Sequence, residues 1–336
     1  MLSKRFIALP VNIIAYHYIR ERHETNFFKP FCREPYEFNS QLEVLNKHGE
    51  FLNIGDNEEI DYYLNSEKDE GYIFTFDDGY KDHLLAAEYL ENFNTRGIFF
   101  VPGEVIDGNT LEVNLVHLLL YNNKIKEDSI INSIDEQIKN KSISLNKFHP
   151  CEFYESFEEY IDKIPSDQGF DKLKTTGIKR LLQRDINSKA VRKEILENLC
   201  EEFIPKKEYV QSINNLYLTK ENINSLINRG HIIGGHGYSH KWLSSLTYKE
   251  QNQDIINSLE SIKFFYTSHN HIEKKWFSYP YGDFNQDTLK IMKDNDIQYA
   301  VSTNWGKATS NKGQHELARW DTNHFWDNSK NIPIIP

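Results

Sequence analysis

Two groups of potential ligand and proton-transfer residues stand out in the chain. Asp77 and Asp78 directly follow the apolar run Tyr72–Phe76. His236 and His240 lie four residues apart in the segment GGHGYSHKWLSSLT. Two neutral imidazoles and one carboxylate are a common ligand set for a divalent metal ion, and they leave coordination positions for water and substrate. These residues could therefore bind a metal ion through one aspartate and transfer a proton through the other.

Each motif by itself also has a simpler interpretation. Asp-Gly is ordinary turn chemistry, so DDG alone indicates a turn. Among 13 histidines, a pair with this spacing arises by chance, and two hydrogen-bonded surface histidines would explain it. The context favours a site, because both motifs follow short β-rich runs and fall at the carboxyl ends of expected strands. Parallel α/β proteins build their sites at that edge. Gly79 adds the backbone freedom that would let both aspartates reach one cavity.

The elements that would position these residues alternate between strand and helix on both sides of a long middle segment. Apolar runs predict strands at Ile7–Tyr16, Tyr72–Phe76, Gly97–Val101, Ile232–Ile233, Trp276–Tyr279 and Gln298–Thr303. Helical spacing and capping signals predict helices at Ser40–Lys47, Lys81–Phe93, Thr219–Arg229, Thr247–Phe265 and Asp287–Asp294. Repeated βα units imply parallel strands with helices outside, as an open sheet or a barrel.

The middle segment has a different composition. Residues 104–213 contain no convincing strand and are rich in Lys, Glu, Asn and Ile. Patterns such as Leu115–Leu120 and Val191–Phe203 suit amphipathic helices. We therefore expect a single domain over residues 1–336 that carries a helical insertion at 104–213. The simplest role for the insertion is a solvated helical bundle, and the alternative is a cover that selects the substrate.

The bulk composition excludes several classes of protein. A formal net charge of -11 leaves no basic excess to neutralise phosphates, so we expect no nucleic-acid partner. No run of 18 apolar residues occurs, so no transmembrane helix is expected. Three widely spaced cysteines without a CxxC motif fit a reducing compartment. Pro10 and Asn12 interrupt the apolar stretch near the start, which argues against a signal peptide. We therefore expect a cytoplasmic protein.

Three motifs in this order carry a family resemblance. TFDDG, HGYSH and YPYG resemble those of the polysaccharide deacetylase family, also called the NodB homology domain or carbohydrate esterase family 4. The resemblance covers roughly residues 1–103 and 214–325. AYHYIRE near the start and LARWDTN near the end look like a subgroup that is associated with bacterial surface-glycan synthesis. The resemblance implies an α/β fold of the distorted (β/α) barrel type. It also implies metal-dependent hydrolysis of an N-acetyl group on a sugar or glycan precursor.

The resemblance further implies roles for individual residues. Asp77 matches the general base of the family, and the metal ligands match Asp78, His236 and His240. Tyr281 matches a position whose backbone N–H helps to hold the oxyanion, and Pro280 shapes that wall of the groove. The chemistry is consistent with these roles, because amide hydrolysis needs an activated water and stabilisation of charge on the carbonyl oxygen.

The chain departs from the family at two positions. The family often has an arginine two or three residues before the proline of the third motif, where this chain has Phe277 and Ser278. It often has a late Leu-x-His that protonates the leaving amine, where this chain has Arg319. We expect Arg319 to replace the missing arginine and to pair with Asp77 or Asp321. The general acid would then be His17, His117 or the water on the metal.

Other choices stay open at the level of sequence. Trp242 and Tyr238 could line a sugar or acetyl pocket, since aromatic faces suit sugar rings, or they could pack within the fold. An Asp-His-His site accepts Zn²⁺, Co²⁺, Ni²⁺ or Fe²⁺, with Zn²⁺ the first expectation. Two alternative functions remain: a glycan-binding pseudoenzyme of weak activity, and an esterase that removes O-acetyl groups. The sequence does not indicate the sugar, its carrier or the oligomeric state.

Overall fold

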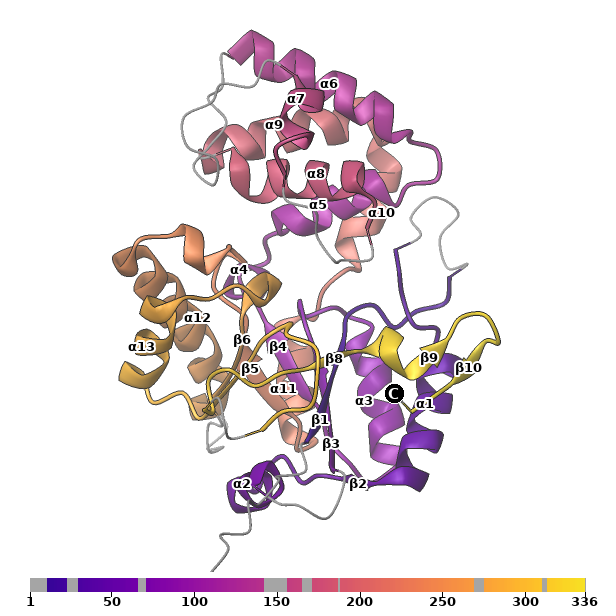
Figure 1. Ribbon diagram of the computed structural model, residues 1–336, viewed down its shortest axis with the longest axis vertical. Helices are drawn as coiled ribbons and strands as arrows, with labels where there is room; N and C mark the ends of the chain where they lie inside the picture. The colour runs from indigo at the N-terminus through magenta and orange to yellow at the C-terminus, as the bar shows by residue number, and fades with distance from the viewer. Residues whose placement is uncertain are drawn as a thin grey trace, which may run out of the picture. The chain divides into compact units, whose positions relative to one another are not determined.

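The computed structural model describes residues 11–22, 30–65, 71–141, 156–164, 171–186, 188–268, 275–309 and 313–335. The chain forms two compact units (Figure 1). The first comprises Met1–Glu21, Phe31–Asn109 and Leu216–Pro336, and the second comprises Arg22–Pro30 and Thr110–Asn215. The first residues of the strand predicted at Ile7–Tyr16 lie outside the described residues. Among the described helices, none is long and apolar enough to cross a membrane.

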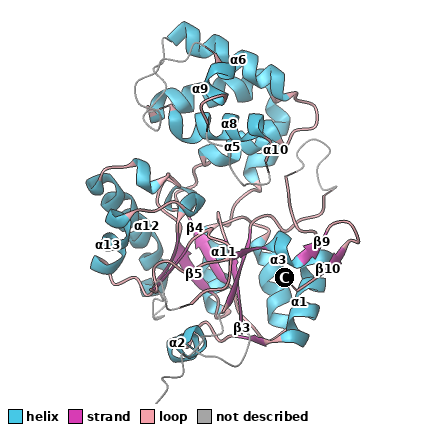
Figure 2. Cartoon of the chain, in the orientation of Figure 1, coloured by secondary structure: helices cyan, strands magenta, loops and turns pink. Residues whose placement is uncertain are grey.

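The first unit is built on an eight-stranded sheet in which every paired strand runs parallel to its neighbours (Figure 2). The main path has the order β7-β6-β5-β4-β3-β1-β8, and β2 pairs with β3. The strands are β1 (Asn12–Tyr16), β2 (Glu50–Phe51), β3 (Gly71–Phe76), β4 (Ile98–Val101), β5 (Ile232–Gly235), β6 (Trp276–Ser278), β7 (Tyr299–Val301) and β8 (Trp320–Asp321). A short antiparallel pair, β9 (Trp326–Asp327) and β10 (Ile332–Pro333), follows.

The two ends of this sheet come together through the segment before β8. Leu317 forms a parallel bridge with Val301 of β7, and three residues later the chain reaches β8 beside β1. The backbone N–H of Arg319 donates to the carbonyl of Asn304 at 3.0 Å, which adds a second link. The sheet therefore curls toward closure, and Arg319 lies where its two ends meet.

Helices surround the sheet, as expected for βα units. They are α1 (Pro35–His48), α2 (Asn57–Asn65), α3 (His83–Asn92), α4 (Gly103–Ile106), α11 (Lys220–Asn228), α12 (Tyr248–Ser268) and α13 (Gln286–Asp294). Figure 1 shows α12 and α13 along one flank, and α1 and α3 along another. The predicted caps form: Thr219 accepts from the N–H of Asn222, and Thr247 exchanges hydrogen bonds with Glu250. Helix α1 begins five residues earlier than predicted, because Pro35 at its first position and a Glu34–Glu37 capping box open it.

The core explains why the strands read as nearly continuous apolar runs. All six residues of β3 and all four of β4 are buried, as in sheets covered on both faces. One cluster unites Ile73, Phe100 and Trp276 from three strands with residues of α2. On the other face, Phe76 stacks on Phe99 with ring centroids 4.7 Å apart. The strands are therefore fixed in position by packing on both sides.

The described residues of the second unit form helices joined by loops, and they contain no β-strand. Its helices are α5 (Glu112–Leu120), α6 (Glu127–Lys141), α7 (Phe157–Ile161), α8 (Leu173–Arg180), α9 (Lys189–Phe203) and α10 (Lys206–Asn214), with a π-helical turn at Leu181–Asp185. Helix α5 packs against α9, and buried Leu119, Leu196 and Leu199 contribute apolar side chains to this unit. The unit therefore has an apolar interior of its own.

Because His231 is buried in the first unit, we expect the folded protein to become less stable as the pH is lowered. His231 accepts from the N–H of Gly97 through Nδ1 at 3.0 Å and contacts Glu91 through Nε2 at 2.8 Å. Burial outweighs the Glu91 charge and lowers the pKa of His231 to about 4, from an ordinary 6.5. Below pH 6.5 the unfolded chain gains a proton that the folded chain does not, so stability falls as the pH falls.

Urea unfolding at pH 8 and pH 5 measures this effect. We expect the wild type to lose about 2 kcal/mol more free energy of unfolding than His231→Gln over this interval. Equal losses in the two proteins would contradict the assignment.

Candidate active site and metal centre

The candidate residues lie on loops that leave the carboxyl ends of neighbouring strands. Asp77 and Asp78 follow β3, and His236 follows β5. The turn Pro280–Gly282 comes two residues after β6. Because the strands are parallel, all these loops lie at one edge of the sheet. The fold thus gathers chemistry-bearing residues that are about 200 positions apart in the sequence.

Asp78, His236 and His240 converge on one point. Their potential ligand atoms all lie within 4.8 Å of one another, and all three residues are buried. The Oδ1 atom of Asp78 is 3.3 Å from Nε2 of His236 and 3.1 Å from Nε2 of His240. Within the described residues, no other group of three or more His, Cys, Asp or Glu residues has this geometry.

Hydrogen bonds orient these three side chains. His236 donates through Nδ1–H to the carbonyl of Ser278 at 2.7 Å, which leaves its Nε2 directed at Asp78. Tyr80 donates its hydroxyl to Oδ2 of Asp78 at 2.8 Å, which leaves Oδ1 directed at the histidines. Partners of this kind fix the tautomer and the orientation of metal ligands.

A cation fits between these atoms. Oδ1 of Asp78 is buried and accepts no hydrogen bond within the described structure. A neutral His236 whose proton is on Nδ1 would direct a lone pair at this oxygen, which is repulsive unless a positive charge lies between them. Burial would raise the pKa of Asp78, but the two imidazoles beside its carboxylate hold that pKa well below its ordinary value. The carboxylate is therefore ionised, and together with two neutral imidazoles it suits a divalent metal ion.

The backbone is held in an unusual conformation at three of the site residues. Asp78, His240 and Tyr281 have φ angles of 74°, 49° and 58°. Residues other than glycine rarely occupy this left-handed region, and such strain concentrates at functional sites. Gly79 also has a positive φ, of 67°, so two consecutive residues after β3 occupy this region.

Asp77 is held by Arg319. The guanidinium donates to both carboxylate oxygens, through Nη1 at 2.9 Å and Nη2 at 2.7 Å. Its remaining donors bind the Ser302 carbonyl at 2.9 Å and the hydroxyls of Thr75 and Ser278. Of the two partners that the sequence left open for Arg319, the structure therefore shows Asp77. Burial would raise the pKa of Asp77, but the Arg319 charge, with that of His236, holds it well below its ordinary value.

The other residue that the sequence proposed as a partner for Arg319 has a different role. Asp321 accepts from the backbone N–H of Asn323 at 2.8 Å and from its side-chain amide at 2.7 Å. It therefore caps the 3₁₀ turn Thr322–Phe325 that follows β8.

His17 and His117, the two histidines proposed as the general acid, lie in different units of the chain. His17 is exposed at the end of β1, next to β3 in the sheet, and its carbonyl accepts from Nε2 of His83 at 2.9 Å. His117 lies on α5 in the second unit, with its ring 5.1 Å from that of Tyr121. His17 is thus the candidate that the first unit brings to the edge where Asp77 lies.

Aromatic side chains form one wall of the site. Trp242 stacks on Tyr281 with ring centroids 4.4 Å apart, and Tyr281 contacts the edge of His240 at 4.6 Å. Pro280 is buried in the same turn. Tyr238 is turned toward α4: its ring lies over Gly103, and its hydroxyl donates to Asp107 at 2.6 Å. The substrate-binding role of Tyr238 stays a prediction.

Sequence reasoning missed Ser278 and Tyr80 as parts of the site. Ser278 binds His236 through its carbonyl, and its hydroxyl bonds to Asp77 and Arg319. The only local signal for Ser278 was its position in the third motif, where the family often has arginine. Tyr80 was visible as the residue after DDG, but nothing in the sequence indicated that its hydroxyl returns to Asp78.

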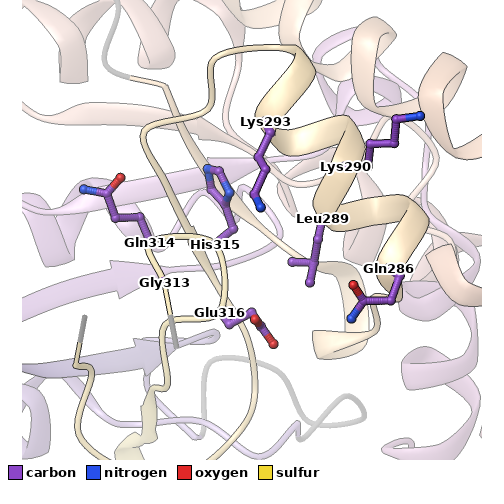
Figure 3. Close-up of a pocket in the computed structure, with 8 residues that line it drawn as sticks. All are labelled: Gln286, Leu289, Lys290, Lys293, Gly313, Gln314, His315 and Glu316. Atoms are coloured by element: carbon purple, nitrogen blue, oxygen red, sulfur yellow. The ribbon is translucent and has the colours of Figure 1, made fainter. Parts of the chain in front are cut away.

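A separate pocket lies away from these residues. A cavity of about 470 Å³ is formed by α13 and the segment 313–316. Figure 3 shows Leu289 and Lys293 of α13 facing the segment that carries His315 and Glu316. The site described above contributes no residue to its lining, so this cavity is not the candidate active site.

Parts of the chain and its fold are similar to known proteins. The family model for polysaccharide deacetylase matches residues 180–300. YxkH of Bacillus subtilis (strain 168), a protein described as a polysaccharide deacetylase, is 29% identical over 103 residues. That match covers 31% of this chain and 36% of the length of YxkH.

Two solved structures share the fold. The deacetylase PplD of Streptococcus pyogenes, in complex with acetate, superposes with a TM-score of 0.53 at 15% identity, over 94% of this chain and 93% of PplD. A de-N-acetylase of Aggregatibacter actinomycetemcomitans gives a TM-score of 0.51 at 12% identity, over 96% of this chain and 98% of that one. The predicted α/β fold of the distorted (β/α) barrel type is confirmed.

The chain therefore has an α/β fold like that of these two structures, and one edge of its sheet carries a donor set suited to a divalent metal ion. Residues 180–300 are similar to the polysaccharide deacetylase family, which is the class of protein that this part of the chain resembles.

Proposed function

We propose that this chain is a divalent-metal-dependent hydrolase that removes an N-acetyl group from a sugar unit of a glycan or glycan precursor. One observation carries the proposal: a buried carboxylate held by arginine lies directly beside a convergent Asp-His-His set. The match of residues 180–300 to the polysaccharide deacetylase family model supports deacetylation of a glycan as the reaction class. The softer resemblance of AYHYIRE and LARWDTN supports a setting in bacterial surface-glycan synthesis.

Each residue of the site has a separate role in the proposed hydrolysis. A divalent ion held by Asp78, His236 and His240 would activate water and polarise the acetyl carbonyl. Asp77 is ionised at neutral pH and would accept the proton of the attacking water. The backbone N–H of Tyr281 would donate to the carbonyl oxygen as negative charge develops there. The Trp242–Tyr281 stack would hold the acetyl group or the sugar ring against this wall.

We further propose His17 as the group that protonates the leaving amine, in place of the late histidine that this chain lacks. Its exposed side chain at the end of β1 supports this role, since a proton donor must reach both substrate and solvent. Loss of a positioned acid costs an amide substrate about 10²-fold or more in turnover. An ester suffers less, because its leaving oxygen departs more readily without prior protonation.

The variant His17→Ala tests that role. We expect acetate release from N-acetylated sugars to fall about 10²-fold, with a smaller loss on O-acetylated sugars and unchanged bound metal. His48→Ala, an exposed histidine at the end of α1, is the matched control and should behave like the wild type. Equal turnover of N-acetylated sugars by His17→Ala and wild type would exclude His17.

The proposed function itself is tested by acetate release from a panel of N-acetylated and O-acetylated mono- and oligosaccharides. The proposal expects release from N-acetylated sugars by protein loaded with Zn²⁺ or Co²⁺, and none after chelation. Release from O-acetylated sugars alone would favour an esterase. Tight sugar binding without release, by a protein that holds its metal, would favour a glycan-binding pseudoenzyme.

A further inference from the structure

A buried carboxylate outside the recognised motifs contacts the loop between the two histidine ligands. Asp254 lies on α12 and is 6% exposed. Its Oδ2 accepts from the backbone N–H of Tyr238 at 2.8 Å, and its Oδ1 accepts from the backbone N–H of Ser239 at 3.1 Å. Both donors belong to the segment that connects His236 to His240.

This loop needs such a support, because its backbone is not stabilised by regular secondary structure. It contains two residues in the left-handed region, Gly237 at φ 65° and His240 at φ 49°. A side chain at Gly237 would approach Asp254 to 3.0 Å, so the carboxylate fits closely beneath the turn. Asp254 therefore sets the path of the chain between two ligands that must converge on one ion.

The charge of Asp254 supports the same conclusion. No lysine or arginine in the described residues forms an ion pair with it, and a buried carboxylate without a cation is costly. Among the buried side chains of the site and its loop, Asp77, Asp78 and Asp254 bring three negative charges, and Arg319 brings one positive charge. With neutral histidines, the remainder of two negative charges equals the charge that one divalent ion would neutralise.

We propose that Asp254 is a positioning residue of the metal centre, which fixes the His236–His240 loop and contributes to the charge balance of the bound ion. This inference rests on the proposed function, because it presumes that Asp78, His236 and His240 hold a divalent ion. Asp254 lies outside the set of three potential ligands. Partners of this kind typically change metal affinity by 10- to 100-fold when they are lost.

The experiment compares Zn²⁺ affinity, by competition with a chromophoric chelator, in the wild type, Asp254→Asn and Glu260→Gln. Glu260 is the matched control: it removes one carboxylate charge from the same helix, and its side chain is 65% exposed. We expect the Zn²⁺ dissociation constant to rise at least about 10-fold in Asp254→Asn and to stay within about twofold in Glu260→Gln. The visible absorption of bound Co²⁺ should also change in Asp254→Asn alone.

Thermal unfolding of the metal-free proteins separates this role from a purely structural one. A structural role would lower the unfolding temperature of metal-free Asp254→Asn and leave its Zn²⁺ affinity at the wild-type value, and that result would overturn the inference. If Asp254→Asn does not fold, Asp254→Ser, which removes the charge but keeps one hydroxyl acceptor, decides: an affinity within about twofold of wild type overturns the inference, and a 10-fold loss upholds it. A wild type that binds no Zn²⁺ would overturn the proposed function as well, so the two failures are distinguishable.

Discussion

Replacing Asp77 by asparagine should reduce acetate release by about 10³- to 10⁴-fold while bound metal stays at the wild-type level. An amide has nearly the same shape but cannot accept the proton of the attacking water. Asp77 is not among the three converging ligands, so the metal should remain. Steady-state kinetics on an N-acetylated sugar, with elemental analysis of the same sample, measures both quantities.

Two outcomes would contradict the role of Asp77. Turnover within about tenfold of wild type would show that another group takes the proton. Loss of metal together with turnover would show that Asp77 is needed for metal binding. Asp82→Asn is a useful comparison, because Asp82 also lies in the loop after β3 but pairs with Arg20 at 2.6 Å. It should retain turnover far better than Asp77→Asn.

Replacing Arg319 by alanine should abolish turnover and destabilise the fold while the metal stays bound. The substitution leaves a carboxylate buried without its cation, and breaking a buried pair in this way costs about 3–5 kcal/mol. Without Arg319, burial would act on Asp77 with less opposition and its pKa would rise. Any residual activity should therefore disappear at a higher pH than in the wild type as the pH is lowered.

The double variant Arg319→Ala, Asp77→Asn provides the control for this prediction. Removing both charges avoids the uncompensated carboxylate, so the double variant should be more stable than Arg319→Ala alone. Urea unfolding of the wild type, the two single variants and the double variant measures this coupling. Additive losses would contradict a direct pair, and loss of metal in Arg319→Ala would contradict its assignment to Asp77.

The sequence predicted the parts of the site that reside in local motifs. Asp77, Asp78, His236 and His240 could be assigned because each belongs to a short pattern at the end of an apolar run. Most strands and helices could be predicted for the same reason. Several short elements were not predicted; for example, α2 has nine residues and β8 has two, and neither has a periodic pattern long enough to be distinctive.

The supporting residues could not be predicted, because their contacts depend on how distant segments pack. Ser278 reaches Asp77 across 201 positions, and Arg319 reaches it across 242. The sequence left Asp77 and Asp321 as possible partners for Arg319. The curl of the sheet toward closure brings Arg319 to Asp77. Asp254 lies outside every motif, and its role depends on α12 packing beside β5. Local patterns therefore indicate the chemistry, and tertiary packing determines its orientation.

The central claim is that Asp78, His236 and His240 form a metal centre, and elemental analysis tests it most directly. The measurement determines bound transition metal in the purified wild type and in His236→Ala, and it requires no knowledge of the substrate. The account predicts roughly one metal ion per chain in the wild type and its loss in the variant. Absence of metal from both proteins, even after addition of Zn²⁺, would contradict the account.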